Sequence, residues 1–600
     1  MSTSALSVRP AIGAAVRIFN APLTLWCVGA VVLFALGQAA ADPARFGTSF
    51  FDSDDATRMV QVREFIAGAP WFDTTLARLG APEPLVSHWS RLIDLPIAAL
   101  IVAFGLVLSP PNAELAARSV WPLILLLPLL WLTARAAEER SGRTGALIAL
   151  VLAVTCFSGL AQFGPGRIDH HNALNLAAVG GILLLAQSFS APRTGLIAGA
   201  LLGAGLAVGL EALLPTVSSL AMAGLLAAWT GRGREGVSNA AALFAATLLA
   251  AFLLTTAPSQ WLDVRCDALS LNLVVLAGTA AAGLSAVLRF AGRAPLWVRL
   301  CALAAAGGAG IALYGSMEPA CLAGPFGQVD PAVVPIWLDH VAETQSFLWL
   351  LENLPIVAAA TLVHVAAGLG AAMLVLRQDR DDGALFYTGA CLVTAALSLW
   401  QLKLVPYAAL LALPPLAIAI GRMRGDGHVS PATSRAAAVV LVNQWTLLGL
   451  AALLLGSSNP ATERTLKLSA ARGACLAAES IAPLASLPNG LVVAEVDQGP
   501  FIAALTPLRV LSAPYHRLDK AILETHAILY ASPEEAKRRL FALDATYVAL
   551  CAGLATTKVQ GTPPADALKP SLLAGHAPAF LEPVPLAADT PLKVWRVTRH

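Results

Sequence analysis

The sequence predicts an α-helical protein that crosses a membrane about 13 times and carries a small external α/β domain at its C-terminal end. Three observations support this fold class. Of the 600 residues, 57% are hydrophobic and only 13% are charged, whereas a soluble domain carries about 25% charged residues. Apolar runs of membrane length recur as far as residue 456, and none follows. We therefore expect a transmembrane domain over residues 1–456 and an external domain over residues 457–600.

The membrane part divides into apolar stretches that are separated by short polar loops. We expect spanning helices near residues 22–41, 117–134, 144–163, 172–190, 194–213, 215–230, 237–256, 270–289, 298–315, 355–376, 384–400, 404–421 and 434–456. A further apolar stretch, 93–109, is short and ends in Ser-Pro-Pro-Asn. We interpret it as an interfacial or re-entrant helix within a long external loop, 42–116.

Arginines in the loops orient these helices, because cytoplasmic loops carry an excess of Lys and Arg. If 93–109 does not span, the arginine-rich loops alternate and place the N-terminus in the cytoplasm. The external side then carries the loops 42–116, 164–171 and 317–354 together with the C-terminal domain. The excess of Ala and of Arg over Lys suggests a high-GC bacterium. We therefore expect the bacterial inner (plasma) membrane, with the external face in the periplasm.

After residue 456 the pattern changes to short alternating elements. Leu491–Val496 and Tyr547–Leu550 are β-like, and Pro533–Leu543 is helix-like, which favours a small α/β domain. Two pairs of cysteines are predicted to lie outside the membrane, where disulfides persist: Cys475 with Cys551, and Cys266 with Cys321. The other four cysteines lie in apolar stretches and are expected to be buried thiols.

Acidic residues gather in the predicted external loops. Asp52, Asp54 and Asp55 crowd one turn directly after the first membrane helix. Such a cluster is unfavourable unless water, a cation or a cationic ligand satisfies it. Asp169 lies in the second loop beside His170 and His171, and Glu343 lies in the third. Each alone is also consistent with a solvated loop acid, but their shared side and low-charge surroundings favour a common divalent cation.

These motifs resemble those of the catalytic subunit of oligosaccharyltransferases, which are membrane glycosyltransferases of the GT-C fold. Asp54 lies 14 residues before Gly68, similar to the family's first motif. Gly166-Arg-Ile-Asp169-His-His171 resembles the family's Asp-x-acid motif, with His171 in place of the second acid. His340-Val-Ala-Glu343 resembles its Thr-Ile-x-Glu-like tetrapeptide. The resemblance implies catalytic roles for Asp54, Asp169 and Glu343 and a metal held by Asp54, Asp169, His171 and Glu343. A histidine ligand favours Mn²⁺ over Mg²⁺.

The resemblance also suggests how a lipid-linked donor is bound. The family carries an Arg ahead of a Tyr-Ala run, and Lys403-Leu-Val-Pro-Tyr407-Ala stands at that place here. Lys403 and Tyr407 are therefore expected at the donor phosphate, although an interfacial anchor would also explain Lys403. Arg167, beside Asp169, is either an ion-pair partner or a second phosphate contact.

Further polar and aromatic residues are candidates for substrate binding. Ser87-His-Trp-Ser-Arg91 opens the interfacial helix, and its mixture suits sugar recognition, although His-Trp is also ordinary at a membrane interface. The Trp-Trp-Asp motif of peptide-modifying members is absent, and its nearest equivalent is Val493-Ala-Glu-Val-Asp-Gln-Gly499, so an Asn-x-Ser/Thr acceptor is doubtful. The predicted substrate contacts are Asp52, Asp55, His88, Trp89, Arg91, His170, Asp497, Tyr515, His516 and Arg517.

Taken together, the residues and the resemblance predict a metal-dependent transferase that moves a glycan from a polyprenyl phosphate or pyrophosphate to a protein, glycan or lipid acceptor. The resemblance implies inversion at the anomeric carbon. An aminoarabinose- or mannosyl-transferase-like enzyme with a monophosphate donor is the first alternative. A transporter or flippase is the second, although such proteins place their ionisable residues near the bilayer midplane. A non-catalytic scaffold is the third. We expect the lipid bilayer and the lipid-linked donor as partners. We expect no nucleic-acid partner.

Overall fold

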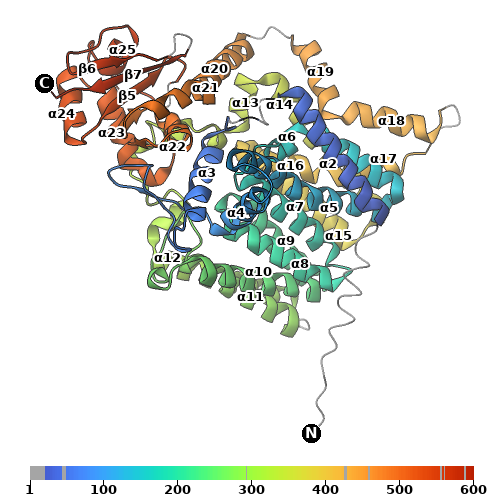
Figure 1. The fold of residues 1–600 in the computed structure, drawn as a ribbon. Helices are drawn as coiled ribbons and strands as arrows, with labels where there is room; N and C mark the ends of the chain where they lie inside the picture. The colour runs from blue at the N-terminus through green and yellow to red at the C-terminus, as the bar shows by residue number, and fades with distance from the viewer. Residues whose placement is uncertain are drawn as a thin grey trace.

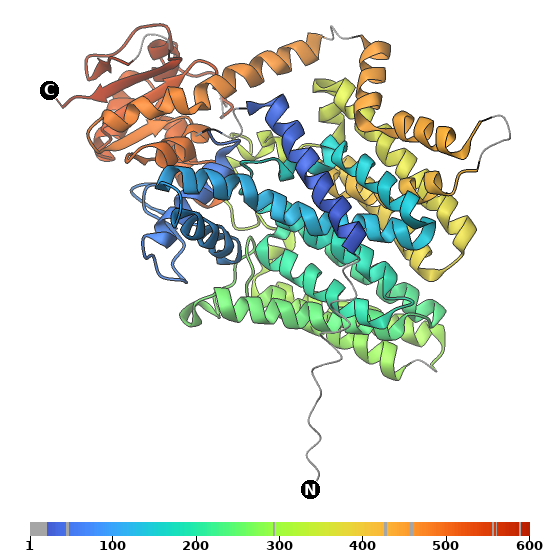
Figure 2. The same ribbon diagram turned by 45° about the vertical axis from the view of Figure 1, so that its right-hand side comes forward.

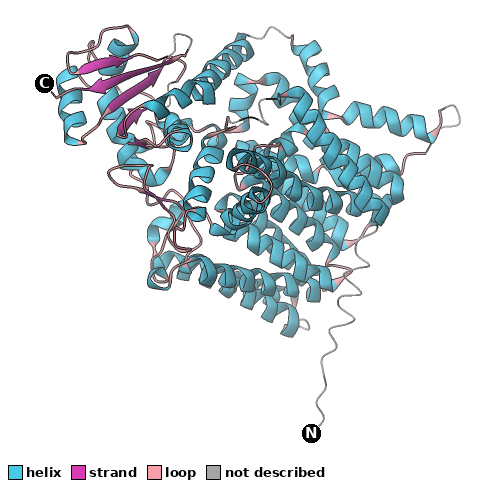
Figure 3. Cartoon of the chain, in the orientation of Figure 1, coloured by secondary structure: helices cyan, strands magenta, loops and turns pink. Residues whose placement is uncertain are grey.

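The computed structural model describes residues 21–43, 47, 49–291, 294–424, 429–456, 460–554, 557–559, 561–586 and 590–599. A large body of helices carries a smaller region at one corner, formed by the C-terminal residues (Figure 1). The longer strands all belong to this corner (Figure 3). The predicted fold class, a polytopic helical protein with a C-terminal α/β region, is confirmed.

Nine helices of the described residues are long and apolar enough to cross a membrane. They are α2 (Ala21–Ala41), α5 (Pro110–Val154), α9 (Leu213–Thr230), α10 (Arg234–Thr255), α11 (Leu271–Phe290), α12 (Leu296–Met317), α14 (Pro355–Asp379), α15 (Asp382–Trp400) and the continuous pair α16 (Val405–Leu411) and α17 (Leu413–Gly421). A bent pair, α18 (Pro431–Val442) and α19 (Gln444–Leu455), adds a tenth span.

Three more spans follow from the details of these helices. α7 (His171–Gln187) and α8 (Pro192–Val208) are apolar but slightly shorter. α5 has 45 residues and would reach about 68 Å, more than twice the hydrocarbon thickness. Gly142 breaks it with a left-handed backbone (φ 69°), so α5 is two consecutive spans. Each of the thirteen predicted spanning segments is thus helical.

The predicted interfacial helix is α4 (Arg91–Gly105). At about 1.5 Å per residue it is about 22 Å long, short of a bilayer core of about 30 Å. It packs against α5 and against α3 (Ser53–Ile66). α4 therefore belongs to the segment 42–116 between two spans, together with the small hairpin β1 (Thr75–Leu76) and β2 (Leu85–Val86).

The remaining loops contain only short elements. They are α6 (Phe157–Leu160), α13 (Phe347–Asn353) and the 3₁₀ turns η2 (Ala161–Phe163), η3 (Leu210–Ala212), η4 (Pro258–Gln260), η5 (Pro319–Ala323), η6 (Pro331–Val333), η7 (Leu338–His340), η8 (Ala342–Thr344) and η9 (Leu402–Leu404). Both expected disulfides form, Cys266 with Cys321 and Cys475 with Cys551. Of the other cysteines, Cys301 is exposed on α12, contrary to expectation, because α12 packs on one side only.

The C-terminal region is built on one mixed sheet. The strands β3 (Leu491–Ala494), β4 (Arg509–Val510), β5 (Tyr547–Cys551), β6 (Leu581–Val584) and β7 (Leu592–Val597) lie in the order β4-β3-β5-β7-β6. β3 runs parallel to β4 and β5, whereas β7 is antiparallel to β5 and β6. All residues of β3 and β5 are buried, as expected for central strands covered on both faces.

Helices surround this sheet and connect it to the membrane part. They are α20 (Pro460–Leu476), α21 (Ala478–Ile481), α22 (Gly499–Leu505), α23 (Asp519–Leu529), α24 (Pro533–Ala542) and α25 (Leu568–Leu573), with the turns η10 (Ala482–Ser486), η11 (Val496–Gln498) and η12 (His516–Leu518). α22 joins the parallel strands β3 and β4, since a parallel pair needs a crossover. α20 runs from the last membrane helices to the sheet (Figure 2).

The first external loop and the C-terminal region share one hydrophobic core. Its buried members include, from the loop, Met59, Val62, Leu79 and Trp89 and, from the C-terminal region, Ile502, Val510, Tyr515 and Leu518. The backbone of Val510 also pairs with the loop: its N–H donates to the carbonyl of Arg78 (2.9 Å) and its carbonyl accepts from Gly80 (3.0 Å). The loop thereby covers the edge strand β4 and fixes α3 beside the C-terminal region.

Candidate active site

Asp52, Asp54 and Asp55 begin helix α3 and play three different structural parts. Asp52 is the N-cap, and its Oδ1 accepts hydrogen bonds from the backbone N–H groups of Asp54 (3.1 Å) and Asp55 (3.0 Å). This cap fixes the first turn of the helix. Because successive helix residues point about 100° apart, Asp54 and Asp55 face different surroundings. Their separation decides which of the two can serve a ligand.

Asp55 is completely buried and holds the second loop in place. Its Oδ1 accepts hydrogen bonds from the N–H groups of Ile168 (2.7 Å) and Asp169 (3.0 Å), and its Oδ2 pairs with Arg167 (2.8 Å). Burial raises the pKa of Asp55 to about 8, although Arg167 opposes the shift. Sequence reasoning predicted that Asp55 contacts substrate. Its contacts show a positioning role, because every carboxylate oxygen is engaged by the protein.

Arg167 is likewise enclosed by protein groups. Its side chain is 2% exposed, and it pairs with Asp52 and Asp55 and contacts Gln162. Of the two roles left open by the sequence, these contacts support the ion pair. A donor phosphate would have to displace a carboxylate from a buried guanidinium, which is costly. We therefore assign Arg167 to the link between α3 and the second loop.

Asp169 stands between two histidines. Its Oδ1 lies 2.5 Å from His170 Nδ1, and its Oδ2 bonds to His171 Nδ1. Burial raises the pKa of Asp169, but the two histidines outweigh burial and hold it well below its usual range. Burial lowers the pKa of His170, but Asp169 and Glu211 raise it to about 9. The predicted ligand Asp169 is therefore ionised and rigidly held.

We call the four predicted metal ligands, Asp54, Asp169, His171 and Glu343, the loop-acid site; of these, Asp169 and His171 have donor atoms that lie, with one of His170, within 4.8 Å of one another. His171 Nε2 lies 3.8 Å from Glu343 Oε2. Burial raises the pKa of Asp54 well above its usual range, and the charges of Asp169, Asp52 and Glu343 raise it further. The three loops that carry these residues thus bring several acids close enough to repel one another. A bound cation would remove the energetic cost of this repulsion.

The loop-acid site has the donor set of a divalent cation. His171 Nε2 is buried and makes no hydrogen bond within the described residues, while its Nδ1 is oriented by Asp169, as is usual for a metal-bound histidine. Three carboxylates and one imidazole suit Mn²⁺ or Mg²⁺, and the imidazole favours Mn²⁺. The residues present therefore fit the predicted ion.

A tyrosine of the C-terminal region reaches this site. The Tyr515 hydroxyl lies 3.0 Å from Asp54 Oδ1 and 3.2 Å from the carbonyl of Ser53. The Trp89 ring packs edge-on against Tyr515 (5.3 Å between centroids) and lies 5.7 Å from the ring of His170. Trp89 and Tyr515, both predicted substrate contacts, therefore form a wall beside Asp54.

A cavity of about 70 Å³ opens next to this wall. Lys403, Trp89 and His170 line it, together with apolar residues at the C-terminal end of α8. Tyr407 lies in α16, just after the turn η9 that carries Lys403. Its side chain is buried, and the charges of Glu211 and Glu343 act on its hydroxyl group. Of the predicted phosphate-binding pair, Lys403 thus lines the cavity, whereas Tyr407 is buried near two acids.

Two acids of this region escaped the sequence analysis. Glu211 Oε1 lies 3.4 Å from His170 Nε2, and Asp267 pairs with His516 (2.6 Å) and with Arg517 (2.6 Å). Glu211 is the sole acid between Asp169 and Glu235, and an acid at the end of a membrane segment is itself a signal of function. Asp267 follows Cys266, and no pattern in the sequence marks it.

Three predicted substrate contacts are instead paired within the protein. Arg91 is 2% exposed and bonds to Asp94 (3.1 Å) and to backbone carbonyls. Asp497 pairs with Arg472 of α20 (2.6 Å). Arg517 donates hydrogen bonds from two of its nitrogens to the carboxylate of Asp267. Their charges are compensated inside the fold, which removes the reason to expect a ligand at each.

Comparison with known proteins identifies the fold. No protein-family model and no curated protein matches the chain. Among solved structures, the oligosaccharyltransferase AglB from Archaeoglobus fulgidus, in complex with an inhibitory peptide and a dolichol-phosphate, matches with a TM-score of 0.63 and 13% identity over 88% of this chain and 69% of that chain. The same enzyme, tethered with an acceptor peptide containing the NVT sequon, matches with 0.59 and 14% over 87% and 69%.

A further match is ArnT from Cupriavidus metallidurans in the apo state, with a TM-score of 0.43 and 14% identity over 95% of this chain and 98% of that chain. At these identities the comparisons establish the fold and leave the activity to the residues of the site. The predicted GT-C-like fold is confirmed.

Proposed function

We propose that the protein is a glycosyltransferase that moves a sugar from a polyprenyl phosphate or pyrophosphate to an acceptor at the membrane face that carries the C-terminal region. The convergence of Asp54, Asp169, His171 and Glu343 from three separate loops carries the proposal. The fold shared with AglB, which is described with a dolichol-phosphate, supports a lipid-linked donor.

A divalent cation would be held by the loop-acid site. When bound, it would act as a Lewis acid that offsets negative charge on the departing phosphate. Asp55 keeps the Asp169 backbone in place, and Asp169 orients His171. The protein therefore supplies preorganised ligands and does not need to assemble them during the reaction.

Apart from the cation, Asp54 and Lys403 are the protein groups that would take part in the reaction. The acceptor oxygen or nitrogen attacks the anomeric carbon, the bond from that carbon to the phosphate oxygen breaks, and the configuration inverts. Asp54 takes the proton of the acceptor or orients the acceptor. Lys403, at the cavity, places a positive charge on the leaving phosphate, as a point charge without the fork of arginine.

The acceptor would approach along the wall formed by Trp89 and Tyr515. Tyr515 already offers a hydroxyl to Asp54, which indicates the place that an acceptor group would take. Asp497, at the position that resembles the Asp of the Trp-Trp-Asp motif, is neutralised by Arg472. An acceptor other than an Asn-x-Ser/Thr peptide follows from this difference.

The arginine loops support the proposed orientation in a bacterial inner membrane. Arg140, Arg232 and Arg380 come from separate loops and line one cavity of about 450 Å³, and Arg422 pairs there with Asp379. A face rich in arginine is the cytoplasmic one. The loop-acid site and the C-terminal region would then be periplasmic.

A release assay tests the proposal. Protein purified in detergent is incubated with a labelled sugar on polyprenyl pyrophosphate and, separately, on polyprenyl phosphate, with Mn²⁺, with Mg²⁺ or with EDTA. We expect metal-dependent release, lowered about 10²- to 10⁴-fold in Asp54→Asn, the range typical of a lost acid–base group. Asp339→Asn, an exposed acid in the loop of Glu343, is the matched control and should retain the wild-type rate.

The outcomes separate the candidate functions. Release from the monophosphate alone favours an aminoarabinose- or mannosyl-transferase-like enzyme. Full release in EDTA or in Asp54→Asn contradicts the role of the loop-acid site. Translocation of the labelled lipid across proteoliposomes without release would make the protein a flippase.

A further inference from the structure

A second group of metal-ligating side chains lies beside the cavity, away from the loop-acid site. His88 comes from the first external loop, Asp267 from the loop between α10 and α11, and His516 from η12. One donor atom of each lies within 4.8 Å of the other two. The rings of His88 and His516 are 4.9 Å apart, and His516 Nε2 is 2.6 Å from Asp267 Oδ2. Three distant segments thus place two imidazoles and a carboxylate together.

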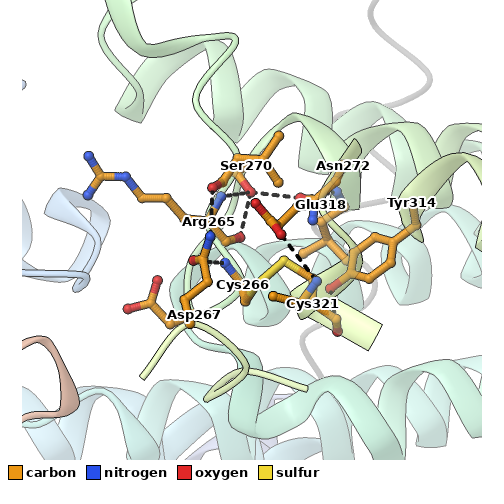
Figure 4. Close-up of a disulfide and its surroundings, with 12 residues drawn as sticks. Arg265, Cys266, Asp267, Ser270, Asn272, Tyr314, Glu318 and Cys321 are labelled. Carbon is orange, nitrogen blue, oxygen red and sulfur yellow. Dashed lines mark hydrogen bonds between the residues drawn. A yellow bond between two sulfur atoms is a disulfide. The ribbon is translucent and has the colours of Figure 1, made fainter. Parts of the chain in front are cut away.

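Covalent and ionic contacts hold these side chains from outside. The disulfide between Cys266 and Cys321 fixes the segment of Asp267, whose side chain points away from the sulfur atoms (Figure 4). Arg517 Nε and Nη2 bond to the two oxygens of Asp267 (2.6 and 2.8 Å), while its Nη1 donates to the carbonyl of Val86 (2.9 Å). Arg517 therefore orients Asp267 and anchors the strand that leads to His88.

Asp267 keeps the capacity to bind a cation despite this arginine. A carboxylate has about four lone-pair sites; Arg517 uses one on each oxygen and His516 Nε2 a second one on Oδ2, which leaves one on Oδ1. An outer partner that orients a ligating carboxylate is a usual feature of metal sites.

The cluster is distinct from the loop-acid site. The two groups have no residue in common, and the Trp89 ring contacts His88 of one (5.8 Å) and His170, which adjoins Asp169 and His171 of the other (5.7 Å). His88, Asp267 and His516 all line the cavity that also contains Lys403. Open coordination positions would therefore face a space that a ligand or water can enter, as in sites with three protein ligands.

We propose that His88, Asp267 and His516 form a second metal site, selective for Zn²⁺. Two imidazoles and one carboxylate suit this ion, whereas the three carboxylates of the loop-acid site suit Mn²⁺ or Mg²⁺. The bound zinc ties the C-terminal region, through His516, to two external loops of the membrane part. It thereby links these segments at the cavity that Lys403 also lines. The proposal does not depend on the proposed function.

Metal content of the full-length protein tests this site without an activity assay. After treatment with a chelator, the protein is loaded with Zn²⁺ or Co²⁺ and washed, and bound metal is measured by elemental analysis. To remove the loop-acid site, the measurement is made in an Asp169→Asn/His171→Gln background. We expect one ion per chain in this background and its loss on adding His88→Gln/His516→Gln. His576→Gln, which removes an exposed histidine, is the matched control and should keep the ion.

A gain-of-signal variant covers the case in which the double substitution impairs folding. His516→Cys should give the Co²⁺-loaded protein a sulfur-to-cobalt charge-transfer absorption that the parent lacks. Zinc content unaffected by His88→Gln/His516→Gln, or no such absorption in His516→Cys, overturns the proposal. The same holds if these variants change only the affinity for a sugar donor, which would make the three residues substrate contacts.

Discussion

The acids Asp52, Asp54 and Asp55 show how neighbouring identical side chains acquire different roles. Asp52 caps α3, Asp55 is buried against Arg167, and Asp54 is left beside Asp169 and Tyr515. The cause is the helical rotation of about 100° per residue, which sends each side chain to a different neighbour. Of these three neighbouring acids, only Asp54 belongs to the loop-acid site.

Lys403 allows a test of donor binding at the level of one residue. Lys403→Met removes the positive charge at the cavity and should raise the KM for the lipid-linked donor about 10- to 100-fold, since a hydrogen bond to a charged group contributes about 1.5–3 kcal/mol. Lys403→Arg keeps the charge and should restore most of the affinity. The measurement is donor-dependent release kinetics.

Lys520→Met, at an exposed position of α23, is the control and should leave the KM unchanged. An unaltered KM in Lys403→Met would assign Lys403 to anchoring at the membrane interface, the alternative that its position also allows.

At the level of elements, the site depends on how helix α3 is joined to the loop before α7. The join consists of Arg167 with Asp52 and Asp55, together with the N–H groups of Ile168 and Asp169 on Asp55. Neither α3 nor the loop before α7 would hold this geometry without the other. A single buried network therefore sets the distance between two of the three loops that build the loop-acid site.

Arg167→Met should break this network. Removing one partner leaves buried carboxylates uncompensated, which costs about 3–5 kcal/mol. We expect a lower unfolding temperature and loss of bound Mn²⁺, measured by thermal denaturation in detergent and by metal analysis. Arg538→Met, which removes an exposed i,i+3 partner of Glu535 on α24, should change neither quantity. Wild-type stability and metal binding in Arg167→Met would contradict the positioning role.

For the whole molecule, the main feature is that residues 491–597 and the loop 42–116 pack into one core. Leu79 and Met59 of the loop lie in the same cluster as Val510 and Leu518. The C-terminal region is therefore part of the site: it supplies Tyr515 and His516 and fixes α3. A cavity lined by charged residues of the arginine loops lies elsewhere in the helical body.

Labelling from one side of the membrane tests the proposed orientation. In a Cys301→Ser background, which removes the exposed thiol, single cysteines are introduced as Asp339→Cys and Arg232→Cys. An impermeant maleimide applied to spheroplasts should label Asp339→Cys and spare Arg232→Cys. Labelling of Arg232→Cys alone would invert the topology and place the loop-acid site in the cytoplasm.

Much of the fold follows from the sequence, because apolar length and loop charge are local properties. The spans, the non-spanning α4 and both disulfide pairs could be predicted in this way. The four residues of the loop-acid site were also named from the sequence, since they stand in short motifs, and their role as metal ligands stays a prediction. Asp267 and Glu211 were missed, because each acquires its partners, His516 and His170, only from distant segments.

The sequence alone determined the class of protein and the candidate site residues, because hydropathy and motif spacing are local properties of the sequence. Three-dimensional packing showed which of those residues are already paired within the protein. Arg91, Arg167 and Asp497 have the same chemical character as the residues at the site, yet each is neutralised by a partner far away in the chain or by the backbone. Charge compensation depends on distances in space, and these exist only after the loops and the C-terminal region share a core.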